Sequence, residues 1–208
     1  METTVVSKKL LKRLPVYLHY IKTLPEGTEN ISATKMAKDL GLGDVMVRKD
    51  LAKVSNGGRR KLGYVRENLI ADIEKFLDFN STTDAIVVGA GKLGQALLDY
   101  CGFEASGLNI VAGFDLHASK RHTNGGKPIY PMTKLPQFCE DNRVAIGIIT
   151  VPAESAQSVC DELIDCGVRA IWNFAPIHLH VPDEIVVQSE NLAVSLTALR
   201  MQLKSQNT

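Results

Sequence analysis

The stretch VVGAGKLGQAL, residues 87–97, contains three glycines in the spacing Gly-x-Gly-x-x-Gly. This spacing is typical of a turn between a buried strand and a helix that holds the pyrophosphate of a dinucleotide. The first glycine permits the tight turn, the second lets backbone amides approach the phosphates, and the third lets the helix pack on the sheet. The N-terminus of that helix adds partial positive charge. The predicted pyrophosphate loop consists of Gly89, Ala90, Gly91, Lys92, Leu93 and Gly94.

An acidic residue follows this loop at the distance expected of a dinucleotide-binding unit. Asp115 ends the next apolar run, 21 residues after Gly94. An acid there accepts hydrogen bonds from the adenosine ribose hydroxyls and repels a 2′-phosphate, which favours NAD(H). Lys120 and Arg121 lie close behind, so the residues alone leave NADP(H) open. They also leave open a domain of this fold that binds coenzyme A or has lost its ligand.

Six cations in the first part of the chain have the residue types that bind nucleic acid. Residues 1–80 carry 15 Lys and Arg against 10 Asp and Glu, a net charge of +5, whereas residues 81–208 carry 9 against 13, a net charge of −4. Arginine can donate to guanine edges and lysine to phosphates, although a solvated surface would have a similar composition. No aromatic residues are interleaved, so stacking on single strands is not indicated. The DNA-binding candidates are Arg48, Lys49, Lys53, Arg59, Arg60 and Lys61.

These cations are expected to lie on a helix-turn-helix unit with a wing. Ser32 is the predicted N-cap of a helix over residues 33–40, and Asp44 is the predicted N-cap of a second helix. Val47, Leu51 and Val54 recur on one side of the second helix, so its basic residues project from the other. The segment SNGGRRKLGY, residues 55–64, predicts a tight hairpin, and a helix over residues 67–79 follows.

A main helix is predicted before this pair. Apolar residues recur at helical spacing from Leu14 to Leu24. Because proline is tolerated only in a first turn, we expect the helix to begin close to Pro15. The residues before it form a basic arm with Lys8, Lys9, Lys12 and Arg13.

The period of the apolar residues changes after a join at residues 80–83. Helical segments are expected at about 93–101, 134–141 and 153–166, between short apolar runs rich in Val and Ile. Such runs are typical of strands buried on both faces, and their alternation with helices predicts a doubly wound parallel sheet. The predicted strands are residues 85–88, 110–114, 144–150, 169–174 and 184–188.

The last helix has more apolar surface than one face of a sheet requires. Leu192, Leu196, Leu199 and Leu203 form one stripe, and Val194, Ala198 and Met201 form a second. Spacing alone favours equally a helix buried in its own subunit and a helix shared between two subunits.

No catalytic or metal site is predicted. Four cysteines without C-x-x-C spacing indicate buried, reduced thiols, and His178-x-His180 is typical of surface residues. No G-x-x-x-x-G-K-[ST] sequence is present, which argues against a triphosphate-hydrolysing P-loop. No run approaches the roughly 18 apolar residues of a membrane span, and no secretory signal is evident. We therefore expect a cytoplasmic protein.

The order of these parts resembles the Rex family of redox-sensing transcriptional repressors. The resemblance rests on KRLPVYLHYI, VRKDL, GGRRKLGY, VVGAGKLGQALLDYCGF, GFD, TVPAESAQ, WNFAP and ENLAVSL, which together span nearly the whole chain. It implies a homodimer with winged-helix domains on a palindromic operator, Rossmann domains that bind NADH or NAD⁺, and exchanged C-terminal helices. It also implies that NADH releases the protein from DNA. The corresponding domains are residues 1–80, 81–190 and 191–208.

The resemblance assigns further site residues by position. It implies that Tyr100 lies near the nicotinamide and couples to the partner's last helix around residues 190–191. The cofactor cleft would also be lined by Thr150, Val151, Pro152 and Asn173. The chain departs from many relatives at His19, at residues 54–55, at Ser195 and in LHASKRHTNGG after Asp115. These departures bear on redox discrimination more than on DNA binding.

Two other functions fit parts of the sequence. One is an NAD(H)-dependent oxidoreductase with a basic accessory domain, in which His178 or Tyr100 would face the nicotinamide. The other is a module that binds coenzyme A or another nucleotide. The first hypothesis, a repressor that reads NADH against NAD⁺ without consuming either, accounts for both the glycine loop and the cations.

Overall fold

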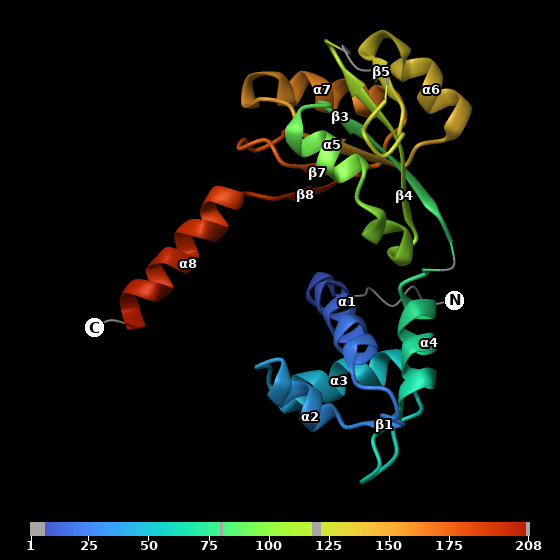
Figure 1. Ribbon diagram of the computed structural model, residues 1–208, viewed down its shortest axis with the longest axis vertical. Helices are drawn as coiled ribbons and strands as arrows, with labels where there is room; N and C mark the ends of the chain where they lie inside the picture. Colours follow the sequence, from blue (N-terminus) through green and yellow to red (C-terminus); the bar gives the residue numbers. More distant parts are fainter. Residues whose placement is uncertain (1–6, 80, 118–121, 207–208) are drawn as a thin grey trace. The chain divides into compact units, whose positions relative to one another are not determined.

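The computed structural model describes residues 7–79, 81–117 and 122–206 and divides into two compact units, Met1–Ser81 and Thr82–Thr208 (Figure 1). The predicted winged-helix unit and Rossmann-like sheet are both confirmed. The finer division at residues 80 and 190 stays a prediction. In the described residues, no helix combines the length and apolarity needed to span a bilayer.

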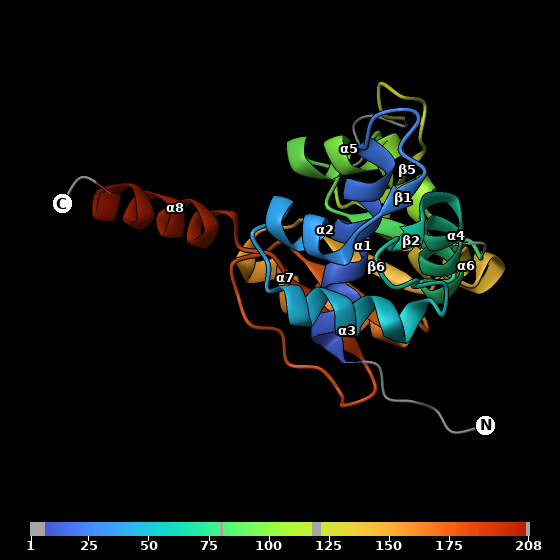
Figure 2. The same cartoon turned by 90° about the horizontal axis from the view of Figure 1, so that it is seen from below.

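The N-terminal unit is a small helical domain with a two-stranded sheet. Strands β1 and β2, side by side in Figure 2, pair in antiparallel fashion. The helices pack around one apolar core that includes Leu14, Tyr17 and Leu51. The elements are α1 (Lys8–Thr23), β1 (Asn30–Ile31), α2 (Ala33–Asp39), α3 (Asp44–Val54), β2 (Tyr64–Val65) and α4 (Arg66–Phe76).

Helix α1 begins earlier than predicted and contains Pro15 in its interior. The predicted basic arm is therefore its first two turns, and Ser7 caps the helix by accepting a hydrogen bond from the Leu10 amide. A proline inside a helix costs about 3 kcal/mol, whereas each buried leucine contributes about 1.5–3 kcal/mol. Leu10 and Leu14 are both buried, while Pro15 lies on the exposed side, where water can solvate the carbonyl it displaces.

The helix pair and the hairpin follow the prediction with small differences. Ser32 caps α2 by accepting from the Lys35 amide at 3.4 Å. The N-cap of α3 is Gly43 rather than Asp44, whose carboxylate binds Arg48 instead of the backbone. The hairpin closes with a single antiparallel bridge between Arg59 and Gly63. The later helix is shorter than predicted and ends at Phe76.

The second unit is a six-stranded parallel sheet in the order β5-β4-β3-β6-β7-β8. The strand order reverses between β3 and β6, and such a switch point opens a crevice beyond the carboxyl ends of the two strands. The short strand β5 ends in a proline and was not predicted. The strands are β3 (Thr83–Val88), β4 (Leu108–Asp115), β5 (Ile129–Pro131), β6 (Ile146–Ile149), β7 (Ala170–Asn173) and β8 (Val186–Ser189).

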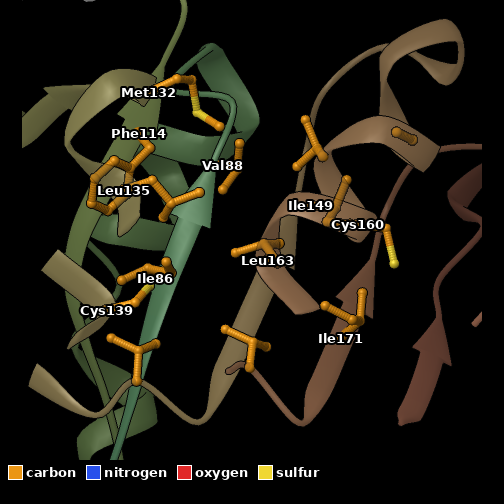
Figure 3. Close-up of a cluster of buried hydrophobic side chains, with 14 of the residues drawn as sticks. Ile86, Val88, Phe114, Met132, Leu135, Cys139, Ile149, Cys160, Leu163 and Ile171 are labelled. Carbon is orange, nitrogen blue, oxygen red and sulfur yellow. The ribbon is translucent and has the colours of Figure 1, made fainter. Parts of the chain in front are cut away.

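Helices cover both faces of this sheet, as expected of a doubly wound fold. Helices α6 (Leu135–Asn142) and α7 (Ala153–Asp165) pack on one face over Ile86, Phe114 and Ile149, as Figure 3 shows. Helix α5 (Lys92–Leu98) and the 3₁₀ turn at Cys101–Ser106 pack on the other face. The sheet core is therefore continuous beneath the switch point.

The end of the chain is much more exposed than the sheet. Strand β8 lies at the edge, and Val186 is 63% exposed, so the prediction that this run is buried on both faces is wrong. Helix α8 (Leu192–Gln206) buries none of its large apolar side chains. The helix is therefore not buried within its own compact unit. The exposed residues are Leu192, Val194, Leu196, Leu199, Met201 and Leu203.

Candidate functional sites

The glycine loop lies at the switch point and is packed against the end of β6. Gly89 has φ of +99°, and a Cβ there would lie 2.9 Å from Val151 Cγ1. A Cβ on Gly94 would overlap the carbonyl oxygen of Gly89, so a side chain at either position would force the loop and helix apart. Gly91 differs, because a Cβ there would meet nothing within 4 Å. The two outer glycines thus close the turn, and the central one faces open space suited to a phosphate.

Two side chains fix this loop from neighbouring strands. Asp115, at the end of β4, accepts a hydrogen bond from the Ala90 amide at 2.7 Å and another from the His117 amide at 2.8 Å. Thr150, just after β6, donates from its hydroxyl to the Gly89 carbonyl at 2.7 Å. Each carboxylate oxygen keeps a lone pair, so Asp115 can still accept from ribose hydroxyls.

A hollow of about 570 Å³ opens beside the loop and contains several of the predicted cofactor residues. The lining residues predicted from sequence are Gly89, Gly91, Asp115, Thr150, Val151 and Pro152. Sequence reasoning missed the opposite wall, which comes from the segment after β4, from Met132 and from α7. Its residues are Leu116, His117, Met132, Ser155, Ser158, Val159 and Glu162. No local motif marks this wall, because it forms only when α7 packs on the sheet.

Other predicted residues lie outside the hollow. Lys92 and Leu93 are exposed on the first turn of α5, which is shorter than predicted and ends at Leu98. Tyr100 is 59% exposed and packs edge-to-face on Phe103, with ring centroids 4.9 Å apart. Asn173 is fully buried, and its amide bonds to the backbone of Ala175 and Ile177, so it shapes the loop after β7. Their roles in binding stay predictions.

The predicted DNA-binding cations are all exposed. Val47 and Leu51 lie on the buried side of α3, and the basic residues of that helix project outward, as their spacing predicted. A second hollow, of about 460 Å³, lies between α2, α3 and the hairpin. It is lined by Ser32, Ala33, Thr34, Arg48, Ala52, Gly58, Arg59, Arg60, Lys61, Gly63 and Tyr64. The structure therefore brings Arg48 and the three hairpin cations to one concave surface.

Arg13, expected on the basic arm, is instead tied to the inside of the domain. Its guanidinium donates to both carboxylate oxygens of Asp50, at 2.6 and 2.9 Å, and the Tyr17 hydroxyl donates to the same carboxylate at 2.9 Å. Burial, together with the hydrogen bond to Asp50, raises the pKa of Tyr17 to about 12. This triad joins α1 to α3, and nothing in the local sequence pattern predicted it.

The cysteines and histidines form no reactive cluster in the described residues. Burial raises the pKa of Cys139 to about 12 and that of Cys160 to about 11, which keeps both as inert thiols. Cys101 is exposed and Cys166 is half-buried, so the prediction that all four cysteines are buried is wrong for these two residues. His178 and His180 lie exposed with ring centroids 5.7 Å apart. No metal-binding group of three or more ligand residues occurs in the described parts.

A winged helix-turn-helix unit with exposed cations, joined to a switch-point crevice with a glycine loop and an acid, defines a class of protein: DNA-binding regulators that respond to a nucleotide. Comparison with known proteins narrows this class to one family. The chain belongs to the Rex family of redox-sensing transcriptional repressors.

Relatives and solved structures support this assignment over nearly the whole chain. The redox-sensing repressor Rex of Porphyromonas gingivalis is 40% identical over 97% of this chain and 94% of the relative. The Rex protein of Bacteroides thetaiotaomicron is 38% identical over 96% and 91%. The crystal structure of the Rex-family repressor RSP with β-NAD⁺ and operator DNA has a TM-score of 0.89 at 31% identity, covering 99% of this chain and 95% of that one.

Further matches agree with the division of the chain. The structure of RSP with β-NADH has a TM-score of 0.85 at 31% identity, over 99% of this chain and 97% of that one. A family model described as a putative DNA-binding protein N-terminus matches residues 5–52. One described as a CoA binding domain matches residues 80–177. The two models thus fall on the two compact units.

Proposed function

We propose that this chain is a repressor that reads the ratio of NADH to NAD⁺ and leaves a palindromic operator when NADH binds. The observation that carries the proposal is the pairing, in one chain, of the Gly89–Asp115 crevice with the cationic surface of α3 and the hairpin. The complexes of RSP with β-NAD⁺ and operator DNA and with β-NADH support it. Because the dinucleotide is a signal here, it is bound and released unchanged.

The crevice suits a dinucleotide pyrophosphate. The open side of Gly91 leaves room for phosphate oxygens to approach the backbone amides of residues 89–94. Asp115 would bind the adenosine ribose, and its negative charge would disfavour the 2′-phosphate of NADP(H). Thr150, Val151 and Pro152 would line the remainder of the site, with Asn173 and Tyr100 toward the nicotinamide. Bound NAD(H) would supply a nicotinamide ring whose charge depends on its oxidation state.

Redox discrimination would depend on that charge. The ring of NADH is neutral and that of NAD⁺ is cationic, and burying an unpaired charge in an apolar site is costly. In the described chain, an aromatic cluster of Tyr100, Phe103, Trp172 and Phe174 lies on the α5 side of the sheet. An apolar pocket that leaves the cationic ring of NAD⁺ unpaired would bind the nicotinamide more tightly when it is reduced.

The exposed apolar residues of α8 support a homodimer. Six large apolar side chains on one helix, each at least 57% exposed, form a surface that soluble proteins normally cover. A second copy of the chain, with the last helices exchanged, would bury both surfaces symmetrically. A two-fold dimer would in turn match a palindromic operator. This is the shared-helix interpretation that the sequence left open.

Binding of NADH would shift the dimer toward a geometry that does not fit the operator. A ligand shifts such an equilibrium only by the difference in its affinity for the two states. A coupling free energy of about 1–3 kcal/mol would change operator affinity roughly 5–150-fold. By reciprocity, operator DNA would weaken NADH binding by the same factor.

We further propose that the protein is cytoplasmic and turns over no substrate. The oxidoreductase alternative requires a proton donor or acceptor beside the nicotinamide. Its candidate His178 does not line the crevice, and His117, which does, lies next to Asp115 at the position proposed for the adenosine ribose. A thermal-shift series with NADH, NAD⁺, NADPH and coenzyme A separates the remaining alternatives. A melting temperature raised by coenzyme A but not by NADH would favour the nucleotide module.

The decisive experiment measures NADH affinity with and without operator. A palindromic duplex is first enriched from a randomised pool, and NADH is then titrated into the protein alone and into the protein–duplex complex. We expect weaker NADH binding in the complex by the factor by which NADH weakens duplex binding. Equal NADH affinities would remove the allosteric part of the proposal. Charge reversal at Arg48 and Lys49 should abolish enrichment while leaving NADH affinity unchanged.

A further inference from the structure

The side chain of Arg48 is held by two neighbours at the start of α3. Its Nε donates to Oδ1 of Asp44 at 3.1 Å, and its Nη2 lies 3.0 Å from Oδ2, so the carboxylate takes one edge of the guanidinium with both oxygens. Nη2 also donates to the Thr34 hydroxyl at 2.9 Å. These contacts use Nε and Nη2, and no acceptor for Nη1 occurs among the described residues.

The clamped arginine presents Nη1 from a fixed position. Arg48 is exposed on the N-terminal half of α3 and lines the hollow shared with the hairpin cations. In a helix-turn-helix domain, the N-terminal residues of the second helix contact base edges in the major groove. The two hydrogens of Nη1 would there face guanine, whose O6 and N7 are the acceptors that arginine reads.

An unclamped arginine would behave differently. Phosphate oxygens flank the groove and attract any free guanidinium, and a phosphate contact positions the protein without reading sequence. Asp44 lowers the affinity of this surface for DNA, because the same phosphates repel a carboxylate. A compensating role for Asp44 is to hold Arg48 away from the backbone.

We propose that Asp44 and Thr34 are positioning residues that make Arg48 a reader of guanine rather than a phosphate contact. The inference rests on the proposed function, since it assigns sequence specificity to the DNA surface described above. The proposal predicts different effects for substitutions of Asp44 and Thr34, because only Asp44 carries charge. Both contribute to orientation, whereas Asp44 alone also lowers the attraction of the domain for phosphates.

The test compares base preferences of the full chain and its variants by enrichment from a randomised palindromic duplex pool, followed by sequencing. We expect Asp44→Asn and Thr34→Val each to reduce the preference for guanine at one position of each half-site by about tenfold, within the range that one arginine–guanine contact supplies. Arg48→Gln should remove the preference at that same position. Asp44→Asn should also steepen the plot of log affinity against log salt by about 0.9, the value for one added phosphate contact.

A matched control removes the same charge elsewhere in the domain. Glu67→Gln changes the first turn of α4 and should leave both the guanine preference and the salt slope unchanged. A wild-type guanine preference in both Asp44→Asn and Thr34→Val would overturn the positioning role of these residues. A guanine preference that is lost only in Asp44→Asn would also overturn it, because the charge of Asp44 and not the orientation of Arg48 would then be responsible. A wild-type chain that enriches no sequence would instead overturn the proposed function. Thermal unfolding of each variant checks that these exposed substitutions leave the domain folded.

Discussion

The dinucleotide crevice and the cationic surface of α3 differ in which atoms define them. The crevice is shaped by backbone, because Gly89 and Gly94 bring the loop, helix and strand end into contact that a Cβ would prevent. The cationic surface is made of exposed side chains on a helix and a hairpin. The first is defined by backbone packing, whereas the second depends on how individual side chains are held.

The crevice and the cationic surface should therefore respond differently to amino-acid substitution. A substitution in the crevice acts on packing between secondary structure elements and therefore on stability as well as binding. A substitution on the cationic surface removes one contact with solvent or DNA and should leave the fold nearly unchanged. The two kinds of variant can thus be separated by measuring unfolding and binding together.

The largest effect is expected at Gly94. In Gly94→Ala, the new Cβ would overlap the carbonyl oxygen of Gly89, so α5 must move away from the sheet and the pyrophosphate loop must deform. We expect NADH affinity to fall more than a hundredfold and the free energy of unfolding to fall by about 3 kcal/mol, the upper range for overpacking. Calorimetric NADH titration and urea unfolding measure the two quantities.

Gly91→Ala is the matched control, because its Cβ would enter open space. This variant should keep wild-type stability and still lose NADH affinity, since the methyl group would occupy the position proposed for the phosphates. Unchanged NADH affinity in Gly91→Ala would place the pyrophosphate elsewhere, and a stable Gly94→Ala would contradict the packing argument.

An intermediate effect is expected at Asp115, the side chain that supplements the backbone in the crevice. Asp115→Asn loses the charge that binds ribose and repels a 2′-phosphate, and its NH2 group cannot accept one of the two backbone hydrogen bonds, from Ala90 and His117, that the carboxylate accepts. Charge-assisted hydrogen bonds contribute about 1.5–3 kcal/mol, so NADH affinity should fall roughly 10–100-fold while NADPH affinity falls less. Asp84→Asn, at the start of β3, is the control. An unaltered ratio of NADPH to NADH affinity would argue against the ribose contact.

Features that depend on a local sequence pattern could be predicted, whereas features that depend on the packing of distant segments could not. The glycine loop, Asp115 and the buried strands were predictable because each depends on a local pattern of a few residues. The wall from α7, with Ser155 and Glu162, was not predictable, because packing across the sheet brings it to the loop. The start of α1 was predicted wrongly, since burial of Leu10 outweighs the local penalty of Pro15.

One feature of the N-terminal unit resembles the glycine loop, because side chains from neighbouring elements hold it in place. Asp50 belongs to the basic segment VRKDL, yet it is 5% exposed and binds Arg13 and Tyr17 from α1. The helix that carries the exposed cations is therefore itself positioned by an internal ionic triad. Sequence alone could not distinguish Arg13, which faces inward, from Lys9 and Lys12, which face solvent.

The smallest predicted effect tests this triad through pH. The pKa of Tyr17, about 12 in the folded chain against an ordinary 10, means that its stabilising contribution is complete below pH 10 and is lost as pH rises through 12. At pH 11 the loss should be about 1.4 kcal/mol. Urea unfolding followed by helical circular dichroism at pH 9 and pH 11 measures it, with Tyr17→Phe as the control that lacks the titrating group. An equal decrease in both proteins would show that the pKa of Tyr17 is not raised in the folded chain, and the ion pair between Arg13 and Asp50 would then be the contact that joins α1 to α3.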